Sequence, residues 1–250
     1  MIVINDVFKE YSNDVKIGKL NIEIPRSGIT SMIGPNGAGK STTLLMAGRL
    51  LDMDAGSIEI SGLNIEKADS DKLARTLAVL KQENHFITKL TVRQLVSFGR
   101  FPYSKGRLTE EDEEIISKYI DFLGLSEMED RFLDQLSGGQ RQRAYVAMVL
   151  AQDTEYILLD EPLNNLDIAR SIQMMKHLRY ACDKFGKTIV IVMHDINIAA
   201  KYSDKICIMK DGKISAFGSP QEIMKSEILT DLFGTQIDVI QGPHGPIAVY

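Results

Sequence analysis

Short apolar segments recur along the chain, and several of them are apolar at every position instead of at every second position. Such segments are typical of central strands in a parallel sheet, where helices cover both faces. Near the N-terminus, residues 20–24 alternate between apolar and polar positions, which is the pattern of a half-buried strand. The pattern predicts strands at residues 2–7, 20–24, 29–33, 76–80, 156–159, 188–193 and 205–209.

Helical periodicity separates two of these strands. It runs from about residue 168 to residue 185, between the strands that begin at Tyr156 and Thr188, and it predicts a βαβ unit. Two helix starts are also recognisable from their capping residues. Thr109 precedes five acidic residues, which complement the positive end of a helix dipole, and Ser219 is followed by Pro220 and Glu222.

The character of the chain changes in its middle third, where only helical patterns are found. We therefore expect an α/β core formed by residues 1–83 and 155–250, with a mainly parallel sheet and an N-terminal antiparallel β region. Residues 84–154 are expected to form an all-helical subdomain inserted into this core.

Composition narrows the class of protein. The 250 residues contain 29 Lys and Arg against 34 Asp and Glu, a net charge of −5, which argues against a general nucleic-acid binder. The two cysteines, Cys182 and Cys207, are too few for a disulfide framework and fit a reducing cytosol. No secretory signal is recognisable at the start, and no apolar stretch approaches the roughly 20 residues of a spanning helix.

One glycine-rich segment matches the phosphate-binding pattern G-x-x-x-x-G-K-[ST], between the strand at 29–33 and a helix expected at 41–51. Glycines let the backbone wrap closely, so that successive N–H groups and the helix N-terminus face the phosphates. Lys40 is expected to reach the β- and γ-phosphates, and the Ser41 hydroxyl to ligate Mg²⁺. The alternative is an accidental glycine-rich turn. The segment comprises Gly34, Pro35, Asn36, Gly37, Ala38, Gly39, Lys40, Ser41 and Thr42.

Two acids end the apolar strand that begins at Tyr156. A carboxylate at the C-terminal end of a core strand, beside a phosphate loop, suits a water-mediated contact with Mg²⁺, and we assign this role to Asp160. Because strand side chains alternate, Glu161 points elsewhere and is expected to face the γ-phosphate and polarise a water. Taken alone, the pair could also be two surface acids.

A second anion-binding segment precedes the helix expected at 141–151. Ser137, Gly138, Gly139 and Gln140 combine small residues and free N–H groups at a helix N-terminus. A nucleotide has one γ-phosphate, yet one chain offers two sites for it. A symmetric dimer solves this, with each nucleotide between the phosphate loop of one chain and the Ser137 segment of the other. The alternative is a loop that only caps its helix.

Together these motifs resemble the nucleotide-binding subunit of an ATP-binding cassette (ABC) transporter over essentially the whole chain, with Leu136–Gln140 as the family signature. The resemblance implies ATP and Mg²⁺ as cofactors. It implies that Gln82 contacts Mg²⁺ and the attacking water, and that His194 contacts the γ-phosphate. It also implies that Asp167, in the Asn165-Leu166-Asp167 loop, lies at the dimer interface, and that Tyr11 stacks on adenine.

Some residues have simpler alternatives. Tyr11 fits a plain strand-end tyrosine and His194 a histidine at the edge of the core, while His85, His177 and His244 share no metal-ligand spacing. Leu163 stands where the family usually has Thr or Ser, a departure that leaves the nucleotide chemistry intact.

The type of ABC protein follows from the same resemblance. A single cassette without fused membrane segments is similar to the ATPase subunit of a bacterial importer, and finer similarity points to the group that imports ferric siderophores, haem and cobalamin. Ferric siderophore uptake is the first choice. Uptake of haem, cobalamin or a metal ion, a non-transport ATPase switch, and a degenerate cassette that only binds ATP are the alternatives. The finer similarity lies in residues 99–103, 136–152, 194–199 and 218–220.

Such a subunit implies a set of partners: a second copy of the chain, membrane permease subunits and, indirectly, an extracytoplasmic solute-binding protein, with no nucleic acid. It implies peripheral attachment at the cytoplasmic face of the membrane. We expect the aromatic stretch at residues 99–103, soon after Gln82, to border the permease. The alternative is that Phe101 and Tyr103 both pack in the core of the helical subdomain.

Overall fold

The protein is described by a computed structural model that covers residues 1–12, 15–82, 89–164, 166–243 and 245–250. Its centre is a six-stranded sheet with the order β10-β9-β3-β8-β7-β6, in which all neighbours are parallel except β9 and β10. This arrangement confirms the predicted fold class, a mainly parallel α/β core. The strands are β3 (Gly28–Ile33), β6 (Leu77–Leu80), β7 (Tyr156–Asp160), β8 (Thr188–Val192), β9 (Lys205–Lys210) and β10 (Lys213–Gly218).

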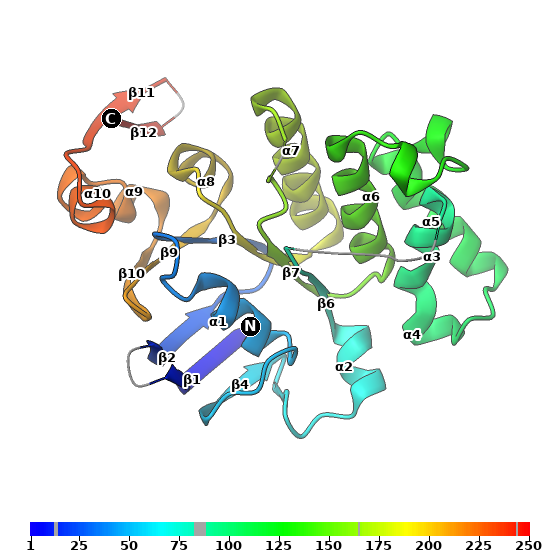
Figure 1. Ribbon diagram of the computed structural model, residues 1–250, viewed down its shortest axis with the longest axis horizontal. Helices are drawn as coiled ribbons and strands as arrows, with labels where there is room; N and C mark the ends of the chain where they lie inside the picture. Colours follow the sequence, from blue (N-terminus) through cyan, green and yellow to red (C-terminus); the bar gives the residue numbers. More distant parts are fainter. Residues whose placement is uncertain (13–14, 83–88, 165, 244) are drawn as a thin grey trace.

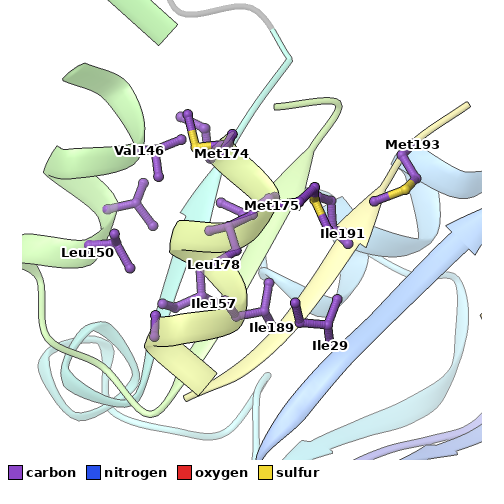
Figure 2. Packing of buried hydrophobic residues seen from close by; sticks show 14 of the residues in the cluster. Ile29, Val146, Leu150, Ile157, Met174, Met175, Leu178, Ile189, Ile191 and Met193 are labelled. Atoms are coloured by element: carbon purple, nitrogen blue, oxygen red, sulfur yellow. The ribbon is translucent and has the colours of Figure 1, made fainter. Parts of the chain in front are cut away.

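Both faces of this sheet are covered, which explains the fully apolar strands. Alternate residues of one strand enter different clusters: Ile157 packs with α7 (Ile168–Phe185), whereas Leu158 packs with α1 (Lys40–Ala47). Figure 2 shows Met174, Met175 and Leu178 of α7 lying over Ile29, Ile157 and Ile189 of the sheet. The helix α7 connects the parallel neighbours β7 and β8, so the βαβ prediction is confirmed.

A second, antiparallel sheet lies on the α1 side and confirms the predicted N-terminal β region (Figure 1). Its order is β2-β1-β4-β5, formed by β1 (Ile2–Ser12), β2 (Val15–Ile24), β4 (Ala55–Ile60) and β5 (Leu63–Asn64). Helix α2 (Ser70–Thr76) follows, with Asp69 as its N-cap. It ends one residue before β6, so the strand expected at residue 76 begins at Leu77.

The middle of the chain forms the helical layer at the end of the molecule opposite the C-terminus (Figure 1). Thr91, Thr109 and Ser137 each close a capping box, as their spacing to Gln or Asp three residues later requires. The elements are α3 (Val92–Ser97), α4 (Phe101–Ser104), α5 (Glu110–Phe122) and α6 (Gly138–Ala151), with short 3₁₀ turns at Phe98–Arg100, Ser126–Met128 and Leu133–Gln135.

The helical layer and the α/β core share one hydrophobic cluster. Val146 and Leu150 of α6 face Met174 of α7 beside the central sheet (Figure 2). Any rotation of the helical layer against the core therefore takes place across a packed apolar surface.

The C-terminal part comprises α8 (Ile196–Tyr202), α9 (Pro220–Ile223), α10 (Ser226–Phe233) and a hairpin of β11 (Asp238–Gly242) and β12 (Gly245–Val249). Ser219 and Glu222 close the predicted capping box. Within the described residues, no helix has the length and apolarity needed to cross a membrane. The predicted boundary at residues 83 and 84, together with His85, Asn165 and His244, lies outside the described residues.

Candidate nucleotide-binding site

The glycine-rich loop connects β3 to α1 at the carboxyl edge of the parallel sheet (Figure 1). Gly37 and Gly39 adopt positive φ angles of 79° and 96°, which glycine reaches without steric cost. A Cβ on Gly34 would lie 2.1 Å from the backbone oxygen of Met209. The loop thus needs glycine at these positions for its own path, and it leads into the N-terminus of α1, where the first backbone N–H groups have no partner within the helix.

Lys40 begins α1 and folds back onto the loop. Its side chain is buried, and its Nζ donates hydrogen bonds of 2.8 Å to the oxygen of Gly34 and 2.9 Å to that of Pro35. Burial lowers the pKa of Lys40, although the carboxylates of Glu161 and Asp160 act in the opposite direction. A cation held inside a glycine loop is suited to bind a polyanion such as a nucleotide phosphate chain.

Ser41 and Asp160 meet next to this loop. Ser41 Oγ donates a hydrogen bond of 2.8 Å to Asp160 Oδ1, so the first turn of α1 touches the end of β7. Burial raises the pKa of Asp160, and the bond from Ser41 opposes this rise. A hydroxyl and a carboxylate at hydrogen-bonding distance are the hard oxygen donors that Mg²⁺ prefers, so the residues present fit this cation.

Glu161 follows Asp160 and is surrounded by three nitrogen atoms. Gln82 Nε2 donates a hydrogen bond of 2.8 Å to Glu161 Oε2, and Asn164 Nδ2 donates a second one to the same oxygen. His194 Nε2 lies 2.9 Å from the other oxygen, Oε1. Gln82 and His194 come from different strand ends, and they meet here because Leu80, Asp160 and Val192 end neighbouring parallel strands.

A cavity of 610 Å³ opens above these residues, a size within the usual range of sites for small ligands. Tyr11 stands at its rim with 53% of its surface exposed, as a ring must to stack on a base. The cavity is lined by Tyr11, Val15, Ile17, Asn36, Gly37, Gly39, Lys40, Ser41, Thr42, Gln82, Glu161, Asn164 and His194.

Not every proposed site residue lines this cavity. Asp160 is linked to the cavity through its hydrogen bond with Ser41. Gly34 and Ala38 are buried within the loop. The carbonyl oxygen of Pro35 accepts a hydrogen bond from Lys40. Val15, Ile17 and Asn164 line the cavity without having been proposed from the sequence. The alternation of apolar and polar residues along β2 is a signal from which Ile17 could have been proposed. The side-chain contact of Asn164 had no signal in the sequence.

The signature segment does not line the cavity. Ser137 caps α6 through a hydrogen bond from the backbone N–H of Gln140, and a Cβ on Gly138 would meet no atom within 4 Å. Asp167 caps α7, where it accepts a bond of 2.8 Å from the backbone N–H of Arg170. Within one chain, these residues are therefore not part of the lining of the cavity that contains Lys40, in keeping with the shared-site hypothesis.

The fold and the phosphate loop define a P-loop nucleotide-binding protein. Its family is defined by comparison: residues 17–164 match the family described as ABC transporter, and the chain belongs to this family. The resemblance inferred from the signature segment is thereby confirmed.

Full-length relatives refine this result. The chain is 69% identical to the petrobactin import ATP-binding protein FatE of Bacillus anthracis, over 100% of both chains. It is 47% identical to the petrobactin import ATP-binding protein YclP of Bacillus subtilis (strain 168), over 100% of this chain and 99% of the relative. Among solved structures it is similar to a dimeric post-hydrolysis state of the cassette MJ0796 bound to ADP and Pi. The TM-score is 0.78 and the identity 28%, over 88% of this chain and 99% of the other.

Proposed function

We propose that this chain is the ATP-hydrolysing subunit of an ABC importer and that it energises uptake of ferric siderophores, with ferric petrobactin as the first candidate substrate. One observation carries the proposal: the identity of 69% to a petrobactin import ATP-binding protein over the full length of both chains. The division into a core of residues 1–83 and 155–250 and a helical subdomain of residues 84–154 is part of the proposal.

The site residues carry out phosphoryl transfer to water mainly by positioning and electrostatics. Lys40 and the loop N–H groups hold the phosphates, and Glu161 orients the attacking water. Mg²⁺, when held by Ser41, Asp160 and Gln82, supplies positive charge for the β- and γ-phosphates. Tyr11 stacks on the adenine ring, and His194 contacts the γ-phosphate.

Two copies of the chain complete the site. The signature segment of one copy, Ser137 to Gln140, in which Ser137 and Gly138 are exposed, caps the nucleotide held at Lys40 of the other, and Asp167 lies at the same interface. Support comes from the cavity itself, which the signature segment of its own chain does not line. The similarity to a dimeric cassette bound to ADP and Pi supports the same assembly.

The segment around Phe101 is the proposed contact with the permease. Phe101 is 55% exposed, whereas Tyr103 is half-buried beneath Arg100, whose guanidinium carbon lies 4.1 Å from the ring centre. The two aromatic residues therefore differ. Phe101 is exposed and available to a partner, as the first hypothesis from the sequence expects, whereas Tyr103 packs within the subdomain, as the alternative expects. Arg100 Nη1 also donates a hydrogen bond of 3.0 Å to the oxygen of Ala151, so this segment is tied to the end of α6, the helix that begins at the signature.

This arrangement suggests how hydrolysis drives transport. Closure of the dimer moves α6, and α6 moves the Phe101 segment and the permease in contact with it. The chain works at the cytoplasmic face of the membrane, bound to permease subunits that receive the substrate from an extracytoplasmic solute-binding protein.

The test is reconstitution of this chain with the membrane proteins encoded beside it. The complex is purified in detergent, placed in liposomes, and supplied with the neighbouring solute-binding protein loaded with ferric petrobactin, a ferric hydroxamate, haem or cobalamin. Ferric petrobactin is expected to stimulate ATP hydrolysis and to enter the liposomes. Stimulation by haem or cobalamin alone would contradict the siderophore assignment, and failure to co-purify with any membrane subunit would favour a non-transport ATPase.

A further inference from the structure

Three side chains contact the carboxylate of Glu161 in this site. Gln82 and Asn164 both donate to Glu161 Oε2, and His194 contacts Oε1, so each oxygen of the proposed base already has a nitrogen partner. The carboxylate is largely shielded from water, with 10% of its side chain exposed. Its direction is therefore set by these three contacts.

Two of the three partners have other tasks in the proposed function. Gln82 and His194 line the cavity and are the residues expected at Mg²⁺ and the γ-phosphate, so we expect a bound nucleotide to draw both away from Glu161. Each arrives from the end of a separate strand, and the backbone N–H of Glu161 donates a hydrogen bond of 3.1 Å to Val192, two residues before His194.

Asn164 differs because it belongs to the same tight turn as Glu161. The backbone N–H of Asn164 donates a hydrogen bond of 3.2 Å to the backbone oxygen of Glu161, three residues earlier. The side-chain amide then reaches back to the carboxylate of that same residue. Glu161 itself, directly after the last residue of β7, has a φ of 51°, a left-handed conformation that non-glycine residues adopt rarely. The turn thus holds the base at both its backbone and its side chain.

We propose that Asn164 is the positioning residue of Glu161, the donor that keeps the carboxylate in its catalytic direction after Gln82 and His194 have turned to the nucleotide. This inference rests on the proposed ATPase function. Asn164 is suited to the task because its amide is neutral at every working pH and donates a hydrogen bond without giving up a proton. A lysine or arginine at this place would neutralise the carboxylate and weaken it as a base.

The reaction that it supports is a displacement at phosphorus. The oxygen of a water molecule forms a bond with the γ-phosphorus, and the bond from that phosphorus to the β–γ bridging oxygen breaks. The electron pair of that bond stays on ADP, and the proton lost by the water passes to the carboxylate of Glu161. Asn164 takes no part in the proton transfer, and its contribution is the angle at which the carboxylate meets the water.

The test compares the kinetics of the complete chain with those of Asn164→Ala, Asn164→Ser and Asn164→Asp. We expect Asn164→Ala to lower kcat by roughly 10- to 100-fold, because misplacement of a reacting group by about 1 Å has an effect of this size. KM and the affinity for ATP stay within about twofold, because Asn164 does not hold the phosphates. Serine, which still offers a hydroxyl donor, restores part of the rate, and aspartate, which repels Glu161, restores none.

A matched control and a double variant separate positioning from a general loss of structure. Asn21→Ala removes another asparagine that donates to a carboxylate, through a bond of 3.0 Å to Asp6 in the N-terminal sheet, and it is expected to leave kcat unchanged. In a Glu161→Ala background the further change Asn164→Ala is expected to have no effect, because the group that it positions is gone.

Three results would overturn the inference: an unchanged kcat in Asn164→Ala, an equal loss of rate when the change is added to Glu161→Ala, or loss of ATP binding in all three Asn164 variants. The proposed function fails in a different way. If the unaltered chain hydrolyses ATP but is not stimulated by a permease and ferric petrobactin, the import assignment is wrong while the relation between Asn164 and Glu161 remains.

Discussion

Ser41 Oγ donates a hydrogen bond of 2.8 Å to Asp160 Oδ1, although the two residues are 119 positions apart in the chain. The bond joins the phosphate loop to the end of the neighbouring strand, and it brings together the two oxygen donors best suited to Mg²⁺ in this site. The relative position of these two oxygen atoms is therefore determined by the sheet, because β7 and the strand that precedes the loop both lie beside β8.

Ser41→Ala is predicted to weaken binding of Mg-ATP by about 10- to 100-fold, the loss typical when one group that holds a metal is removed. Binding of ATP without Mg²⁺ is expected to change little, because Lys40 and the loop N–H groups are untouched. Isothermal titration with and without Mg²⁺ measures both affinities. Ser97→Ala, which removes a hydroxyl from α3, is the control, and an equal loss without Mg²⁺ would contradict the assignment.

Phe101→Ala and Tyr103→Ala are predicted to affect different properties of the protein, the first its stimulation by the permease and the second its stability. Phe101→Ala is expected to leave the melting temperature unchanged and to reduce permease-stimulated hydrolysis, because this ring is exposed and is the proposed contact with the permease. Tyr103→Ala lowers stability by about 0.5–3 kcal/mol, because its ring covers Arg100. Thermal unfolding of the isolated chain and hydrolysis by the reconstituted complex measure the two effects. Normal stimulation in Phe101→Ala would remove this residue from the permease contact.

The buried pair of Arg100 and Asp112 is predicted to stabilise the helical subdomain. Arg100 Nε donates a hydrogen bond of 2.8 Å to Asp112 Oδ1, and both residues are buried. Asp112→Asn leaves the arginine charge without its partner and is expected to cost about 3–5 kcal/mol at pH 7. Asp71→Asn is the control, since Asp71 forms an exposed pair with Lys105 that contributes little.

This pair also has a predicted pH dependence. Burial alone raises the pKa of Asp112, but hydrogen bonds from Thr109 and Arg100 outweigh burial and hold the pKa below its usual value. A carboxylate with a lowered pKa in the folded state stabilises the protein above its unfolded pKa, about 3.9, and this stability is lost as the pH falls through the folded pKa. Urea unfolding measures the free energy of unfolding of the unaltered chain and of Asp112→Asn. The difference between these two free energies is thus expected to shrink below about pH 4. A difference that grows with acidity would contradict the account.

The sequence predicted the parts of the fold whose pattern is strong. The helix at 168–185 is confirmed at both ends, since Asp167 caps its start and Gly186 its end. Helix α1 ends at Ala47 instead of residue 51, because Gly48 and the left-handed Arg49 terminate it. Helix α6 begins at Gly138 instead of residue 141, because the capping box of Ser137 includes the glycines.

Other parts lacked a local signal. The strands β4, β5, β10, β11 and β12 were not predicted, because they are short or partly exposed and are held by pairing with distant strands. In the site, the spacing of the glycine-rich motif predicted the loop, and the apolar strand that ends in two acids predicted Asp160 and Glu161. That Gln82, Asn164 and His194 would all meet Glu161 depends on strand register and on one left-handed residue, neither of which is visible in spacing.

The proposed nucleotide site between two copies of the chain leads to two predictions for Glu161→Gln. The variant keeps the shape of the side chain but loses the basic carboxylate, so hydrolysis is predicted to fall by roughly 10²–10⁴-fold while ATP binding survives. Loss of one negative charge near the γ-phosphate also favours the closed state. Lys40→Ala, in contrast, removes the cation from the loop and is predicted to bind ATP poorly and to remain monomeric.

Light scattering on a sizing column, with Glu161→Gln and Lys40→Ala each run with and without Mg-ATP, is the most direct measurement of this account. The predicted result is a dimer only for Glu161→Gln and only with Mg-ATP, formed around two nucleotides that each lie between Lys40 of one chain and Ser137 of the other. A Glu161→Gln chain that binds ATP and stays monomeric at high concentration, or that hydrolyses ATP at the unaltered rate, would contradict it.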